Sequence, residues 1–103
     1  MLTNKNRVIN LPRKKFYLTT AIPYVNSVPH TGHALEFVQT DVIARYHKLL
    51  GEGVFLTTGA DENSLKNVQA ATEVGITTQQ LCDKNAAIFK ELAIKIGLSF
   101  NSF

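Results

Sequence analysis

A short apolar run, a long amphipathic segment and a second short apolar run follow one another near the start of this chain of 103 residues. The two runs, 16–20 and 54–57, have the length and composition of strands in a parallel sheet. Helical spacing between them, with Gly51 as a stop, predicts a helix over 31–50. The apolar residues expected on its core face are Leu35, Val38, Val42, Tyr46 and Leu49. Strand, helix and strand over about forty residues form a βαβ crossover, which makes both strands parallel.

Two more helices and the start of another strand are predicted after this unit. One helix begins at Asn63 or Ser64 and ends at Gly75, and its expected core residues are Leu65, Val68 and Ala71. A capping box, Thr77-x-x-Gln80, opens the last helix. Its expected core residues are Leu81, Asn85, Ile88, Leu92 and Ile96. Residues 98–103 alternate apolar and polar like a strand that is beginning, so the predicted class is α/β, in the order β-α-β-α-α.

The segment that joins the first strand to the first helix carries His30, Gly32 and His33. Free backbone N–H groups at a helix start favour phosphate, and side chains at i and i+3 are able to reach one phosphate together. Gly32 adds no side chain, so a flat nucleotide is able to lie against the backbone. Imidazole donors suit the transition state of nucleotidyl transfer. The alternative is that both histidines are ordinary polar residues at a helix entrance.

Two sequence blocks around this junction resemble a known family. Residues 20–33, Thr-Ala-Ile-Pro-Tyr-Val-Asn-Ser-Val-Pro-His-Thr-Gly-His, are similar to the His-Ile-Gly-His signature of class I aminoacyl-tRNA synthetases, in the methionyl-tRNA synthetase version. Residues 55–66, Phe-Leu-Thr-Thr-Gly-Ala-Asp-Glu-Asn-Ser-Leu-Lys, are similar to the Phe-x-x-Gly-Thr-Asp-Glu-His-Gly-x-Lys block of that family. The chain departs from the family pattern at Ser27, Thr31 and Asn63-Ser64.

The resemblance implies roles for individual residues. His30, Gly32 and His33 match the ATP-binding signature, with both histidines as catalytic groups that stabilise the α-phosphate region. The methionine site would include Ile22, Tyr24 and Asp61, with the Asp61 carboxylate on the α-ammonium group of the amino acid. Without the family context, Asp61 would be interpreted as a helix cap or turn residue and Tyr24 as a packing residue.

The resemblance also implies an activity and a missing remainder. A methionine–tRNA ligase uses ATP with Mg²⁺ to form methionyl adenylate and transfers the methionyl group to tRNA(Met). We expect a truncated chain: residues 1–15 as a basic arm, and 16–103 as the first half of a Rossmann-like nucleotide-binding catalytic domain. Zinc is expected only in the missing remainder, with no metal site in this chain. Alone, the chain is expected to have at most trace adenylation activity and to self-associate, because a sheet edge and one helix face lie uncovered.

Composition and charge limit the possible partners, the location and the disulfide content of the protein. Eleven Lys and Arg against eight Asp and Glu give a net charge of +3, and five of the basic residues precede the first strand. This arm either contacts RNA phosphates or is a solvated leader. No apolar run is long enough to span a membrane, so a cytoplasmic location is expected. The single cysteine, Cys82, has no partner for an internal disulfide.

Two other functions stay open from the sequence. The first is another enzyme with the same signature, either a different class I synthetase or a small nucleotidyltransferase. The second is a non-catalytic remnant that binds nucleotide or protein without turnover.

Overall fold

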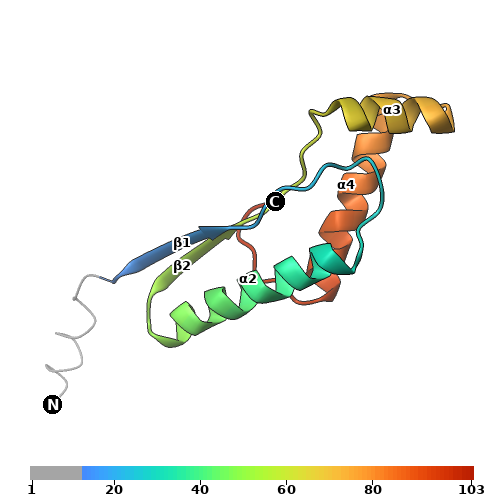
Figure 1. Cartoon of the computed structure of the whole chain (residues 1–103). Helices are drawn as coiled ribbons and strands as arrows, with labels where there is room; N and C mark the ends of the chain where they lie inside the picture. Colours follow the sequence, from blue (N-terminus) through green and yellow to red (C-terminus); the bar gives the residue numbers. More distant parts are fainter. Residues whose placement is uncertain (1–12) are drawn as a thin grey trace, which may run out of the picture.

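The computed structural model describes residues 13–103, and most of the arm expected over 1–15 lies outside this range. The elements follow the predicted order β-α-β-α-α (Figure 1). They are β1 (Lys15–Thr19), α2 (Thr31–Leu49), β2 (Gly53–Thr57), α3 (Leu65–Val74) and α4 (Thr78–Lys95). None of the described helices is long and apolar enough to cross a membrane.

The sheet consists of β1 and β2, which pair in parallel as the crossover requires, with Lys15 opposite Gly53 and Thr19 opposite Thr57. The chain end returns to the far side of β2, where Ser102 forms a parallel bridge with Thr57. Asn101 strengthens this contact, because its N–H donates to the Leu56 carbonyl at 2.7 Å. The strand expected from the alternation over 98–103 is therefore present as a single bridge (Figure 1).

The core lies between β2, α2 and α4. Its buried members are Val25, Phe37, Ala44, Leu56, Cys82, Phe89, Ala93 and Leu98. The residues that α2 buries are Phe37, Thr40 and Ala44. The expected core face of α2 is wrong, because its five apolar residues all lie exposed on the opposite side of the helix: Leu35, Val38, Val42, Tyr46 and Leu49. Helical spacing identifies an apolar face without showing what that face packs against.

The caps of α3 and α4 are those expected from the sequence. Ser64 caps α3, and Gly75 ends it in the left-handed conformation at φ 74°. Thr77 and Gln80 form the predicted capping box of α4, each side chain accepting from the backbone N–H of the other. The predicted core face of α3 is partly wrong: Ala71 is buried, whereas Leu65 and Val68 are exposed. The fully buried residue near the start of α3 is the polar Asn67.

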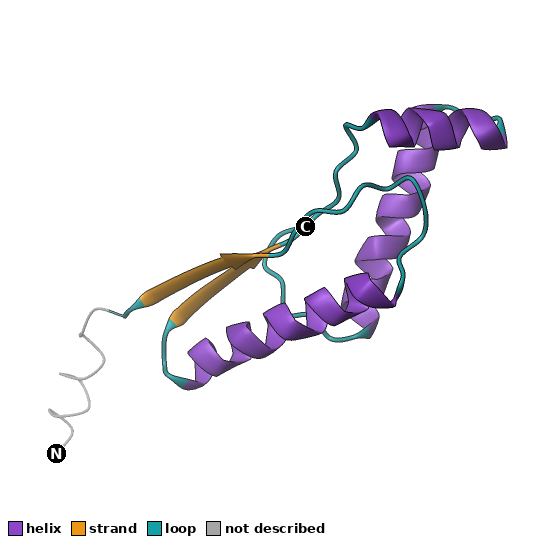
Figure 2. Ribbon diagram, in the orientation of Figure 1, coloured by secondary structure: helices purple, strands orange, loops and turns teal. Residues whose placement is uncertain are grey.

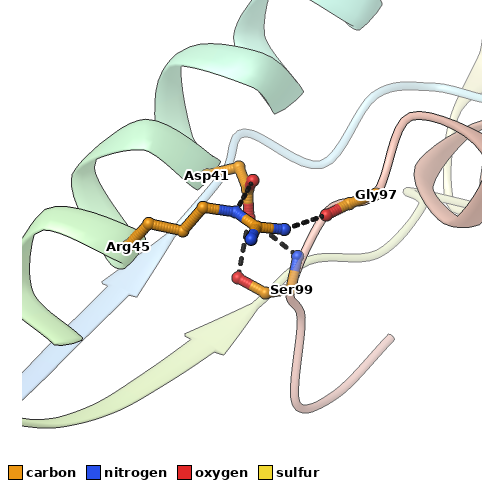
Figure 3. A network of polar contacts seen from close by, with 4 residues as sticks. All are labelled: Asp41, Arg45, Gly97 and Ser99. Atoms are coloured by element: carbon orange, nitrogen blue, oxygen red, sulfur yellow. Dashed lines mark hydrogen bonds and ion pairs between the residues drawn. The ribbon is translucent and has the colours of Figure 1, made fainter. Parts of the chain in front are cut away.

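A polar network fixes the turn after α4 against the middle of α2 (Figure 3). Asp41 Oδ1 accepts from both the N–H and the hydroxyl of Ser99, at 2.8 and 2.7 Å. Arg45 donates to Asp41 Oδ2 at 2.5 Å and to the Gly97 carbonyl at 2.8 Å. Although burial opposes ionisation, these hydrogen bonds from Ser99 and Arg45 hold the pKa of Asp41 below its usual range. The network holds the turn after α4 against α2, and this turn leads the last residues of the chain to β2.

Candidate functional site

Two loops leave the carboxyl ends of β1 and β2 and run beside each other (Figure 2). Just past the strands, the buried hydroxyl groups of Thr20 and Thr58 lie 2.6 Å apart. Further on, Tyr24 and Asp61 form a parallel bridge, in which the Asp61 N–H donates to the Pro23 carbonyl at 2.8 Å. The two family-like blocks are thus joined at two points. They lie at the edge where open α/β sheets bind ligands.

The two histidines cap α2. The Gly32 N–H donates to His30 Nδ1 at 3.0 Å, and the His30 N–H donates to His33 Nδ1 at 3.1 Å. The imidazole rings stack with their centroids 3.8 Å apart. His30 is exposed and His33 is half-buried, and its ring packs edge-to-face with Phe89 of α4, with the two ring centroids 4.9 Å apart. The structure therefore brings the predicted pair together at the start of the helix, and both rings are also part of its cap.

Gly32 is required by the position of the His30 ring. A Cβ atom built at residue 32 would lie 2.8 Å from Cε1 of His30 and 3.0 Å from its Nδ1. Real Cβ atoms do not approach other atoms this closely, so any larger residue displaces the imidazole. The glycine in this signature thus lets the first histidine fold back onto the helix.

Charge and burial act together on His33. Burial lowers its pKa, the neighbouring His30 lowers it further, and Glu36 acts in the opposite direction. Glu36 also holds the loop, because its Oε1 accepts from the Ala21 N–H at 2.6 Å. His33 is therefore biased toward the neutral form near neutral pH, and it lies near a loop that α2 itself positions.

The residues expected to bind methionine lie on the same two loops. Ile22 and Tyr24 are about half exposed, at 54% and 46%. Asp61 Oδ1 accepts from the Asn63 N–H at 2.9 Å, which is the turn geometry that the residue would adopt without any ligand. The ammonium group of Lys66 lies 5.9 Å from the centre of the Tyr24 ring. The backbone bridge brings Tyr24 and Asp61 together, with the Tyr24 ring open to solvent.

Sequence reasoning missed several residues that position these loops. Thr58 and Glu36 hold the loops as described above, and two buried asparagines act from the helices. Asn85 of α4 donates to the Val25 carbonyl at 2.7 Å, and Asn67 of α3 donates to the Asp61 carbonyl at 3.2 Å. The available signal was a polar residue on an otherwise apolar helix face, since a buried amide needs a partner.

Over residues 13–103 no group of three His, Cys, Asp or Glu side chains is arranged to hold a metal ion. Cys82 is buried, and burial raises the pKa of its thiol, with Glu62 and Asp83 acting in the same direction.

Comparison with known proteins identifies the family. Residues 16–103 match the family described as tRNA synthetases class I (M). The chain is 45% identical over 93 residues to the methionine–tRNA ligase of Mesorhizobium japonicum, a match covering 90% of this chain and 18% of that protein. It is 43% identical over 90 residues to the methionine–tRNA ligase of Mycobacterium leprae, covering 87% of this chain and 17% of the relative.

A solved structure supports the same family. Mycobacterium tuberculosis methionyl-tRNA synthetase bound by methionyl-adenylate superposes with a TM-score of 0.86 at 42% identity, covering 87% of this chain and 18% of that chain. The chain thus spans about 18% of the length of these proteins. Its two parallel strands and their helices match the start of a Rossmann-like class I synthetase domain. From the family match and this shared fold, the chain belongs to the class I tRNA synthetases, in the family designated M.

Proposed function

We propose that this chain supplies the ATP and methionine contacts of the first half of a methionine–tRNA ligase catalytic domain. In this proposal the complete protein joins methionine to ATP and passes the methionyl group to tRNA(Met) in the cytoplasm. The single observation that supports the proposal is that the histidine-capped start of α2 and the loops joined by the Tyr24–Asp61 bridge all follow the carboxyl ends of the two strands.

The proposed chemistry proceeds in two steps. A methionine carboxylate oxygen attacks the α-phosphorus of ATP, the bond to the bridging oxygen breaks, and pyrophosphate leaves. A ribose hydroxyl at the 3′ end of tRNA(Met) then attacks the activated carbonyl, and AMP leaves. His30 and His33 donate hydrogen bonds to the phosphate in the first step, while the Asp61 carboxylate holds the methionine ammonium group. These residues contribute positioning and charge stabilisation, with no covalent intermediate on the protein.

The M. tuberculosis enzyme binds methionyl-adenylate in its crystal structure, and this ligand combines parts of both proposed substrates. The half-exposed Tyr24 ring leaves an aromatic surface available for an apolar side chain. Its partner Asp61 lies on the adjoining loop. A carboxylate beside an apolar surface fits an amino acid with an uncharged side chain.

A chimeric enzyme tests this proposal. Residues 16–103 of this chain would replace the matching segment of M. tuberculosis methionyl-tRNA synthetase, and methionine-dependent exchange of pyrophosphate into ATP would be measured. We expect exchange with methionine, and little with leucine or isoleucine. Asp61→Asn in the chimera should raise the KM for methionine by about tenfold or more, because it removes a charged hydrogen bond of about 1.5–3 kcal/mol.

The alternatives give different results in the same assay. Exchange that prefers another amino acid would assign a different class I synthetase. A folded chimera without exchange for any amino acid would favour a remnant that binds without turnover. For the 103-residue chain alone, we propose trace exchange at most and self-association through surfaces that the described residues leave uncovered.

A further inference from the structure

The cap of α2 differs in chemistry from the caps of the other two helices. In α4 the capping acceptors are the oxygens of Thr77 and Gln80, and in α3 the acceptor is the Ser64 hydroxyl. In α2 both acceptors are ring nitrogens, Nδ1 of His30 and Nδ1 of His33. An oxygen cap works at any ordinary pH, whereas an imidazole nitrogen accepts only while it carries no proton.

Two acceptor nitrogens specify one tautomer for both rings. Each Nδ1 receives a backbone N–H, so each neutral ring must carry its proton on Nε2. Nε2 lies across the ring from the capped backbone, so both remaining donors point away from the helix cap. The two imidazole rings that carry these N–H groups stack with their centroids 3.8 Å apart.

We infer that His30 and His33 act as neutral Nε2–H donors in a tautomer set by the helix cap, and that protonation of either ring opens the cap. The choice of ligand rests on the proposed function: two neutral donors at a helix start suit the oxygens of a phosphate ester such as ATP. The tautomer and its coupling to the helix start rest on the hydrogen bonds of this chain alone.

The surroundings of His33 support its neutral form. Burial of His33 against Phe89 of α4 and repulsion from a charged His30 both disfavour protonation. Glu36 is the charged group that favours it. The Glu36 carboxylate already accepts the Ala21 N–H, which fixes one of its oxygens on the loop.

The third histidine provides an internal control. His47 Nδ1 lies 2.5 Å from Oε2 of Glu52, a carboxylate that is 8% exposed. This carboxylate, whose pKa is lowered first by the hydrogen bond from His47, can only accept at that contact. His47 must therefore carry a proton on Nδ1, the opposite of the arrangement expected for His30 and His33.

Nitrogen NMR on the ¹⁵N-labelled 103-residue chain tests the inference, because two-bond correlations to the ring carbon-bound protons report which nitrogen carries the proton. Above about pH 7 we expect Nε2–H at His30 and His33, and a proton on Nδ1 of His47. On acidification, the protection of the Gly32 and His30 amides, taken relative to the intrinsic exchange rate at each pH, should fall in step with protonation of the pair. A proton on Nδ1 of either signature histidine at neutral pH, or unchanged amide protection after protonation, would overturn the inference.

A variant that keeps a helix cap but lacks the imidazole donors separates the two roles of the histidines. His30→Ser with His33→Gln converts the start of α2 to the Ser-x-x-Gln form of a capping box, like that of α4. We expect α2 to keep its amide protection in this variant at both neutral and acidic pH. Loss of protection at acidic pH equal to that of the wild type would contradict the coupling.

An ATP titration distinguishes failure of the proposed function from failure of the tautomer inference. ATP should shift the Nε2 resonances of both signature histidines, and should bind about tenfold or more weakly to the capping variant. Failure of ATP to bind the wild-type chain while both tautomers are as expected would count against the proposed function and leave the tautomer assignment intact. Binding that is equally tight in the capping variant would overturn the donor role.

Discussion

His30, Gly32 and His33 each contribute to the start of α2, in addition to the role proposed for them in catalysis. The Cβ atom that Gly32 lacks would meet the His30 ring at 2.8 Å. The space at residue 32 therefore serves the histidine directly, whereas a role in close nucleotide approach remains a prediction. One glycine thereby determines where the donors of His30 lie.

Gly32→Ala should displace the His30 ring and break its hydrogen bond to the residue 32 N–H. The lost cap, about 1 kcal/mol, is offset by the better helix propensity of alanine, so little change in thermal stability is expected. The change should appear as loss of the fixed Nε2–H tautomer at His30 in nitrogen NMR. Gly59→Ala is the matched control, because its Cβ would lie at an ordinary 3.6 Å from Ile22. An unchanged His30 tautomer in Gly32→Ala would contradict the steric argument.

Because the pKa of His33 is lowered in the folded state, the free energy of unfolding should depend on pH. A base whose pKa is lower in the folded state binds protons more readily when unfolded, so it destabilises the fold as pH falls below its unfolded value of about 6.5. Urea unfolding between about pH 7 and pH 5 should therefore show a larger loss of stability in the wild type than in the Ser-x-x-Gln capping variant. His47 and Glu52 are present in both proteins, so their contribution cancels. Equal losses would show that the pair does not carry the effect.

At the scale of elements, the sequence predicted which segments form helices and strands better than it predicted what they pack against. The bounds of α2 and α3 depend on local signals, Gly51 and Gly75 at their ends and Ser64 at a start, which act within a few residues. The buried side of α2 depends instead on which side faces the two strands. That side carries small and polar residues, Thr40 and Ala44, beside a single large one, Phe37. Apolar spacing alone selected the more strongly apolar side, which is exposed.

In the candidate site too, local sequence patterns predicted residues that are close in sequence and missed contacts between distant segments. The positions of His30, Gly32 and His33 were recognisable because they lie within one helical turn. Contacts such as Asn85 with the Val25 carbonyl join residues 60 positions apart, and no local pattern records them. The Tyr24–Asp61 bridge likewise joins two loops that are far apart in the sequence.

The Asp41 network gives a prediction about how α2 is joined to the end of α4. Asp41→Asn should lower the free energy of unfolding by about 1–3 kcal/mol, because charged hydrogen bonds to Ser99 and Arg45 are lost at a site where the Asp41 side chain is 14% exposed. The pKa of Asp41 is depressed in the folded state, so its contribution is complete above the unfolded value of about 3.9 and is lost at lower pH. Urea unfolding should show the two proteins converging in acid.

Glu91→Gln is the control for this prediction. It breaks an ion pair with Lys95 at the same i, i+4 spacing, but both side chains are more than half exposed. Solvent screens such pairs, so no measurable change in stability is expected. A similar loss in both variants would mean that the Asp41 network contributes no more than a surface ion pair.

At the scale of the whole molecule, the described residues bury one side of a two-stranded sheet and leave other apolar surface open. Tyr17 of β1 and Phe55 of β2 stack on each other at 6.0 Å and are 63% and 47% exposed. β1 pairs only with β2 among the described strands, so its other edge carries free backbone groups. Together with the exposed side of α2, this is more apolar surface than a small monomer ordinarily presents.

We therefore expect the 103-residue chain to self-associate as its concentration rises. The exposed side of α2 is the favoured contact, since a helix face with Val42 at 61% and Leu49 at 86% exposure gains from burial in a second copy. Sedimentation velocity over a concentration series should show an average sedimentation coefficient that increases with concentration.

Val42→Lys should weaken association by placing a charge on this face. Gln69→Lys, at an exposed position of α3, adds the same charge elsewhere and should change it less. Equal effects of the two lysines would indicate repulsion from net charge. Association that neither variant alters would point to the free edge of β1, and a single monomeric species at all concentrations would refute the expectation.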